Sequence, residues 1–424
     1  MPVAATSALT AGDGDVNVLD PSFEIPSLWR ANLGADVFFD IGRFEGFKLS
    51  VDYIYGVNDA APFWRDISCG DPIGAAPDSR PIYNCGLDQA FLDNLGTQQI
   101  IDFYDDSGIA ATAATAAFDA DGDGTVELQE VEVAPEALFL TNINKGDQHI
   151  FTTRLSKDWD DLGWFGSLFT SFSYTYQDAQ DAHSGTSSTA SSNYSDYASF
   201  DRQNPRTAVS NYQREHDFKL KLDWEKEFIQ DAPTKVTLFA NRRAGQPFSY
   251  TYDYSGGSER SLFGIREGRA DDEGELFYVP TGASDPLFNS AASFGGDADT
   301  LNDFLNFLNT SGLSEFAGGI APRNEFESRW YTSVDIRIQQ QIPGPGWRET
   351  DRLIGFLDIE NVGNLINDEW GFLEQVRYEY FQPVANVDIV DGQYVYSGFP
   401  ERSEERITHA ASLWQVQLGV KYVF

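Results

Sequence analysis

Two deficits limit what this chain can be. It has no run approaching the roughly 18 apolar residues that a membrane helix needs, which excludes a protein that crosses a membrane with helices. It is also poor in positive charge, with 29 Lys and Arg residues against 66 Asp and Glu residues and a net charge of −37. A field of this sign repels nucleic acid and attracts cations, so nucleic-acid binding is excluded.

Cysteine is nearly absent, since Cys69 and Cys85 are the only two. In an oxidising compartment they would close a local loop, whereas in the cytosol they would remain free thiols. We expect a disulfide between them if the chain is exported. Residues 1–6 contain neither a basic nor an apolar stretch, so we expect no signal peptide here. Export would then require an N-terminal part that precedes this sequence.

Aromatic residues are abundant, at 14% of the chain, and they occur in runs that alternate between apolar and polar residues. Within 45–56, for example, Phe47, Leu49 and Val51 share one face, while Lys48 and Ser50 share the other. This alternation predicts half-buried β-strands. The nine predicted strands are 29–40, 45–56, 147–157, 163–177, 214–228, 234–251, 329–341, 351–362 and 412–424.

The connections between these runs are alternately short and long. Tight turns follow the first, third, fifth and seventh strands. Long polar segments follow the others, at 57–146, 178–213, 252–328 and 363–411. In a meander, all the long loops then emerge at one end of the sheet. This asymmetry is typical of bacterial outer-membrane barrels, whereas a soluble β-sandwich gives no reason for it. Residues 1–28 are expected to form a loop or linker.

Two of the long segments show structure of their own. Apolar residues with helical spacing predict a helix within 300–309, and 374–397 is expected to form a hairpin that turns at Asp391-Gly392.

The C-terminal strand resembles the signal by which the barrel-assembly machinery recognises outer-membrane proteins. That signal is carried here by Gln417, Gly419, Tyr422 and Phe424. The apolar face of the strand continues to the last residue, whereas chain termini usually fray into polar residues. The alternative is an ordinary edge strand that happens to end the chain.

Further segments are similar to TonB-dependent receptors, and in particular to the Oar-like subfamily. Residues 358–368 resemble the strand end before the last loop of these receptors. The stretches 141–146, 243–250 and 312–324 resemble other parts of the subfamily, so that the resemblance covers 17–424. It implies a barrel of about 22 strands, an N-terminal plug domain and coupling to the TonB system. Nine strands cannot close an even-numbered meander that has both chain ends in the periplasm, so the resemblance implies the C-terminal part of a barrel.

Residues 119–130 match the twelve-residue calcium loop of EF-hands. Gly124 provides the sharp turn, and the oxygen-only ligand set favours Ca²⁺ over Zn²⁺. Ala110–Phe118 is a candidate entering helix, whereas 131–135 leaves little room for an exiting one. The alternative is a solvated acidic turn. The expected ligands are Asp119, Asp121, Asp123, the carbonyl of Thr125, Glu127 through water, and bidentate Glu130.

No motif indicates catalysis. The sequence has no phosphate-binding glycine loop, nucleophile elbow or Cys/His metal cluster, and its histidines are scattered: His149, His183, His216 and His409. We therefore expect a protein that is not an enzyme.

The sequence thus predicts an all-β fold: an incomplete antiparallel transmembrane barrel of about nine strands, at 29–424, in the outer membrane of a Gram-negative bacterium. The expected function is solute uptake by a receptor whose surface loops are stabilised by calcium. Outer-membrane lipid or lipopolysaccharide, the missing plug and strands, and the TonB system are the expected partners. A surface-binding or structural protein without transport, and a secreted soluble β-domain, are the alternatives.

Overall fold

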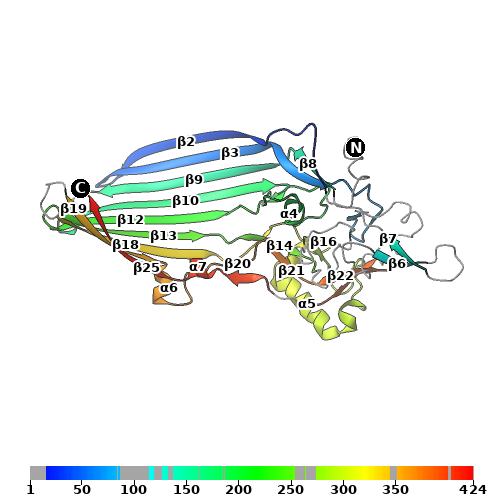
Figure 1. The fold of residues 1–424 in the computed structure, drawn as a ribbon. Coiled ribbons are helices and arrows are strands. Elements are labelled where there is room, and N and C mark those ends of the chain that lie inside the picture. Colours follow the sequence, from blue (N-terminus) through cyan, green and yellow to red (C-terminus); the bar gives the residue numbers. More distant parts are fainter. Residues whose placement is uncertain are drawn as a thin grey trace.

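The computed structural model of the chain describes residues 16–83, 85, 114–118, 127–131, 137–160, 162–183, 185, 187–253, 263, 274–343, 351–399 and 403–423. Within these ranges the chain is mostly β-structure, with one 12-stranded sheet, one three-stranded sheet and five two-stranded sheets. Figure 1 shows the long strands running side by side, with the small sheets and helix α5 (Ala298–Thr310) gathered at one end. The C-terminus lies at the opposite end.

Neighbouring long strands of the large sheet follow one another in an antiparallel meander. Each of the nine ranges predicted from alternation overlaps one of these strands. They are β2 (Ser27–Ile41), β3 (Phe44–Asp66), β9 (Gly146–Trp159), β10 (Ser167–Asp181), β12 (His216–Ile229), β13 (Ala232–Arg243), β18 (Tyr331–Pro343), β19 (Arg352–Glu360) and β25 (Gln415–Val423).

The sheet is larger than the sequence predicted, because three short strands extend it at the end where the long connections leave. β8 (Ala137–Ile143) pairs with the last part of β3, and β1 (Val16–Leu19) pairs in parallel with β8. β11 (Ala208–Val209) pairs with the end of β10. We refer to this end of the sheet as the loop end and to the other as the turn end.

One predicted strand was too long. The range 234–251 is divided between β13, which ends at Arg243, and β14 (Pro247–Thr251), which belongs to the three-stranded sheet. Between them the chain passes against Ser328, and a Cβ atom on Gly245 would collide with the backbone of that residue. Apolar and polar residues continue to alternate in the sequence between β13 and β14, which explains why the pattern does not show where β13 ends.

The turn end is built from short hairpin connections. Gly42 between β2 and β3 has a φ of 60°, and Asp231 between β12 and β13 has a φ of 57°. Tight hairpin turns require such left-handed conformations because their twist matches that of the strands. The long connections therefore all leave from the loop end.

The described strands form an open sheet. At one edge β2 pairs with β3 and with no other described strand, and at the other edge β25 pairs with β19 in the same way. The antiparallel β-architecture is confirmed, but these strands do not close into a barrel. No helix in the described ranges is both long and apolar enough to cross a membrane.

The described parts of the long connections lie at the loop end of the sheet, and we call them together the loop lobe. Its small sheets are β14–β17 (Phe326–Glu327)–β21 (Phe381–Pro383), β15 (Tyr278–Val279)–β16 (Gly319–Ile320), β20 (Glu374–Val376)–β24 (Glu405–Ile407), β22 (Asn386–Val390)–β23 (Gln393–Ser397), β4 (Gly74–Ala75)–β5 (Pro81–Ile82) and β6 (Ala114–Phe118)–β7 (Glu127–Val131). Its helices include α4 (Ala190–Ser195), α6 (Val362–Ile366), α7 (His409–Ser412), η2 (Ser293–Gly296) and η3 (Leu313–Phe316), while η1 (Gly163–Phe165) lies at the turn end.

The helix predicted within 300–309 is confirmed as α5. The backbone N–H of Asp299 donates to the carboxylate of Asp297, which caps the first turn, and Phe304 and Leu308 are buried. The predicted hairpin is confirmed in part: β22 and β23 turn at Asp391-Gly392, both with positive φ. Residues 374–376 do not join it, because β20 pairs with β24 instead.

The lobe has an aromatic core that the sequence analysis did not predict. Residues of three long connections contribute to one buried cluster, which includes Ile82, Tyr252, Phe277, Phe304 and Tyr396. Tyr252, Phe304 and Tyr396 are completely buried. The described parts of these three connections are therefore packed against one another.

Candidate functional site

The two faces of the large sheet differ sharply in chemistry. A row of directly paired residues crosses seven neighbouring strands and is apolar throughout: Trp159, Leu168, Trp224, Val236, Ile338, Leu357 and Leu418. The adjacent row, displaced by one residue, is polar except for one phenylalanine: Asp158, Phe169, Asp223, Thr237, Arg337, Asp358 and Gln417. Because successive side chains point to opposite faces, the sheet has an apolar face and a polar face.

The apolar face is not covered by other parts of the described chain. Leu33 on β2 is 75% exposed and Leu418 on β25 is 80% exposed. Even on the central strands, Phe172 of β10 is 46% exposed. Soluble monomers rarely leave a contiguous apolar surface of more than a few hundred Å² in contact with water. The described residues therefore leave an extended apolar surface uncovered.

Aromatic rings line the turn end of the apolar face. Phe44 and Phe47 both contact the ring of Trp159, with ring centres 5.4 and 6.1 Å apart. The ammonium group of Lys157 lies 4.7 Å from the centre of the Trp159 ring. An aromatic body with a cation at its polar edge is suited to a boundary between an apolar and an aqueous phase.

A second line of rings crosses the loop end of the same face. The Tyr53 hydroxyl lies 2.7 Å from Nδ1 of His149, and the Tyr174 hydroxyl lies 3.0 Å from Nδ1 of His216. The His216 ring also stacks on Trp330, with centres 5.9 Å apart. Two of the four histidines thus belong to this aromatic line.

The polar face is a network of paired charges. Asp223 accepts a hydrogen bond from Thr237 at 2.7 Å and forms an ion pair with Lys221 at 2.7 Å. The guanidinium of Arg337 lies 3.4 Å from the carboxylate of Asp358. Such a face suits water and polar solutes.

The C-terminal residues selected from the sequence divide between the two faces. Gln417 lies on the polar face opposite Asp358, and Tyr422 lies on the apolar face, where its hydroxyl donates to Asp351 at 2.8 Å. Gly419 pairs with Phe356, whose ring covers it, so that a Cβ atom at this position would collide with the ring. Phe424 lies outside the described residues. Gly419 therefore has a packing role in the sheet, whatever its role in recognition.

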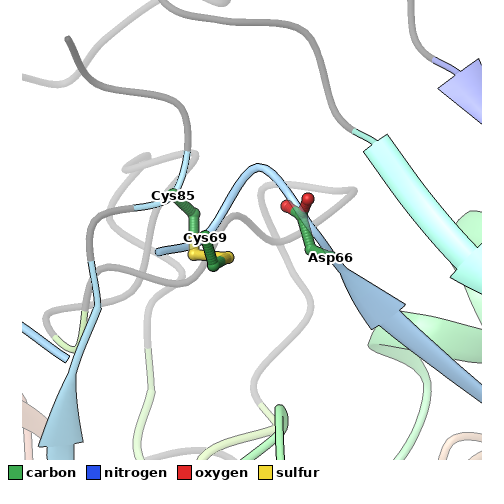
Figure 2. A group of neighbouring side chains, drawn as sticks. All are labelled: Asp66, Cys69 and Cys85. Atoms are coloured by element: carbon green, nitrogen blue, oxygen red, sulfur yellow. A yellow bond between two sulfur atoms is a disulfide. The ribbon is translucent and has the colours of Figure 1, made fainter. Parts of the chain in front are cut away.

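The predicted disulfide is confirmed, and Figure 2 shows it beside Asp66 at the end of β3. Cys69 and Cys85 pack in a small cluster with Tyr83, Leu138 and other apolar residues. The carboxylate of Asp66 and the two sulfur atoms all lie within 4.8 Å of one another. Metals bind thiolates, however, and these sulfur atoms are bonded to each other. The disulfide therefore has a structural role: it links Cys85 of the first long connection to Cys69, which lies just after the end of β3.

The predicted calcium loop falls mostly outside the described residues, as do Asp119, Asp121, Asp123 and Thr125. Glu127 and Glu130 lie in β7, of which the structure gives the backbone. β6 pairs with β7 in register, with Phe118 opposite Glu127 and Thr115 opposite Glu130.

This pairing corrects the expectation of an entering helix over 110–118, because residues 114–118 form a strand. A helix this short is marginal without packing, whereas the hairpin gains a backbone partner for each residue. The hairpin therefore differs from the helix–loop–helix frame of an EF-hand.

Sequence reasoning missed a group of buried polar residues where 178–213 meets 274–323. The Nε2–H of His183 donates a hydrogen bond to the backbone carbonyl oxygen of Asn193, 2.6 Å away. Burial lowers the pKa of His183 to about 4 and raises the pKa of Tyr197 to about 12. Arg202 and Arg323 are at most 4% exposed. The sequence signal that could have indicated this group is the occurrence of arginine close to aromatic residues within an otherwise polar connection.

No protein-family model and no curated protein sequence matches this chain. The resemblance to TonB-dependent receptors therefore stays a prediction, and the functional argument rests on the geometry.

Proposed function

We propose that this chain forms part of an outer-membrane β-barrel, with the apolar face against lipid and the polar face toward the barrel interior. The observation that carries the proposal is the pair of adjacent rows, one apolar and one polar, that cross the same seven strands. Lipid removes the exposed apolar side chains from water, and the hydrogen bonds of the sheet pair the polar groups of the backbone.

The height of the apolar face supports this environment. On β3 the aromatic boundaries are at Phe47 and Tyr55. The segment from one to the other is nine residues long, and a β-strand that crosses a membrane at a tilt of about 45° needs roughly 9–11 residues. In outer-membrane barrels the apolar band likewise lies between two aromatic girdles. Short turns at one end and long connections at the other also follow the arrangement of such barrels, in which the loops face outward.

Solute uptake is the function we infer for the completed barrel. The segments that resemble TonB-dependent receptors support it, and the polar interior face is compatible with it. In this proposal, additional strands pair with the edges at β2 and β25, and a plug domain and contact with the TonB system come from other residues of the same protein or from a separate chain. The proposal assigns no catalytic step to this chain.

Fractionation of bacteria that produce the protein tests this function. We expect it to remain with the outer membrane after a carbonate wash, to require detergent for extraction, and to purify together with a polypeptide that contains a plug domain. Release into the soluble fraction would contradict the membrane proposal as a whole. Extraction by detergent without any plug-bearing polypeptide would leave the membrane assignment intact and overturn the uptake proposal.

The loop lobe favours a second candidate function. Its aromatic core, with Phe277, Phe304 and Tyr396 in contact, holds the connections in one defined shape. A rigid outer surface suits a protein that binds a partner or lipopolysaccharide without transport. This is the function that purification without a plug-bearing polypeptide would favour.

We also propose that Ca²⁺ orders the segment around 119–130. Five carboxylates fall within twelve residues of an acidic chain, and they repel one another without a cation. We expect limited proteolysis to cut this segment at least about tenfold faster in chelator than in millimolar Ca²⁺, since binding to the folded form stabilises it. Asp119→Ala should be cut rapidly under both conditions, and Asp388→Ala on β22 should behave like the wild type. Cleavage that is equal with and without chelator would mean that the motif is a solvated acidic turn.

A further inference from the structure

A cavity of about 220 Å³ lies in the loop lobe, between the connection 178–213 and the connection 252–328. Its walls are mostly apolar and aromatic, and they include Tyr197, Phe200, Leu276 and Ile320. Arg206 and Arg323 also line it. An apolar cavity with a few convergent polar groups is the usual form of a site for a small molecule.

Two guanidinium groups flank the ring of Phe200. The guanidinium carbon of Arg206 lies 4.7 Å from the ring centre, and that of Arg80 lies 5.3 Å from it. Arg80 is almost completely buried, whereas Arg206 is exposed at the cavity. Cations at these distances are attracted to the face of an aromatic ring, so the ring holds both groups in place.

The ring of Tyr197 has the same arrangement. Arg202 and Arg323 lie 5.3 and 6.0 Å from its centre, measured from their guanidinium carbons. Arg323 is 4% exposed, and its Nε has no hydrogen-bond acceptor among the described residues. Four arginines therefore surround the two rings that line the cavity, in a chain whose net charge is −37.

Carboxylates within the lobe neutralise only part of this positive charge. Arg80 pairs with Asp78 at 3.3 Å, and Arg323 pairs with Asp181 at 2.6 Å. Arg206 has a ring contact, but no carboxylate of the described chain lies within ion-pair distance of it. Its charge is thus available to a ligand at the mouth of the cavity.

We propose that this cavity binds a small aromatic carboxylate. The ring of the ligand lies among Tyr197, Phe200 and Ile320, and its carboxylate accepts hydrogen bonds from the guanidinium of Arg206. A planar guanidinium suits a carboxylate because it can donate two parallel hydrogen bonds. This site goes beyond membrane insertion and uptake, and binding to it requires neither.

Isothermal titration of the full chain in detergent with benzoate, and with uncharged benzamide of the same shape, tests the proposal. We expect one saturable site for benzoate and binding of benzamide weaker by about tenfold or more, as for the loss of a charged hydrogen bond. Arg206→Gln should weaken benzoate binding by a similar factor, while Arg206→Lys should retain most of it. Arg43→Gln, at an exposed arginine of the turn end, should leave it unchanged.

A bulky side chain at the mouth of the cavity distinguishes binding inside the cavity from an ion pair that benzoate forms with Arg206 at the surface. Thr207 lines the cavity and is exposed, so Thr207→Trp should exclude benzoate without disturbing the fold. Three results would each overturn the proposal: no saturable benzoate binding, equal binding of benzoate and benzamide, or unchanged binding in Arg206→Gln. Undiminished binding in Thr207→Trp would place benzoate outside the cavity and would overturn it as well.

Discussion

Arginine in place of Leu238 should lower the free energy of unfolding in a lipid bilayer by about 2–4 kcal/mol, the cost of a cation near the middle of the lipid-facing surface of a barrel. Leu238 lies near the centre of β13, on the apolar face, and it pairs with Leu222 on one side and Ile336 on the other. Reversible urea denaturation in phospholipid vesicles, followed by tryptophan fluorescence, measures the change.

The neighbouring residue supplies a matched control. Thr237 lies on the same strand but on the polar face, where it donates to Asp223. Thr237→Arg should change the free energy of unfolding by less than about 1 kcal/mol, because the new cation lies beside a carboxylate in a hydrated environment. If the two variants were equally stable in vesicles, both faces would be in contact with water. That result would contradict the membrane proposal.

The faces of the sheet could be predicted because they depend on local periodicity. In β3, Phe47, Leu49 and Val51 lie on the apolar face, and Lys48 and Ser50 lie on the polar face, as the alternation predicted. The period of two follows from backbone geometry alone. The α5 helix and the β22–β23 hairpin depend on similar short-range signals, an apolar spacing and an Asp-Gly turn.

The loop lobe could not be predicted because its contacts join distant parts of the chain. Arg80 donates a hydrogen bond to the carbonyl of Leu276, 196 residues away. Phe288 and Tyr394 form an isolated bridge between two long connections. Each connection is polar on average, and its aromatic residues have no regular spacing. The sequence therefore shows which residues could form a core, but not that they meet.

The same limit applies to the candidate binding cavity and to the calcium segment. Tyr197 and Ile320 line one cavity although they belong to different connections, and no motif links them. In the calcium segment the motif gives the ligand types, but the twelve-residue pattern does not determine the flanks. Strand β6 ends just before the segment, and β7 includes its last four residues, because strand pairing competes with helix formation where neither is strongly favoured.

Removal of the disulfide, by the paired change Cys69→Ser and Cys85→Ser, should lower the free energy of local unfolding of the loop lobe by about 3 kcal/mol. The bond closes a loop with a sequence separation of 16 residues, and a loop of this length gives about that stabilisation in the chain-entropy model. The free energy of unfolding of the meander should not change, because its backbone hydrogen bonds do not depend on the disulfide. Hydrogen exchange should therefore quicken by about a hundredfold in the lobe, since local opening sets the exchange rate there.

The position of the bond determines which amides should respond. Cys85 is 1% exposed and packs with Tyr83, Leu138 and Tyr194, which join the first connection to β8 and to α4. Amides of β8 and α4 should lose protection, whereas amides of β12 and β13 should not. Reductant should produce the same pattern in the wild type and no further change in the double variant. Equal loss of protection in β12 and α4 would mean that the lobe and the sheet unfold as one unit, and unchanged protection in both would mean that the bond adds no stability to an already packed lobe.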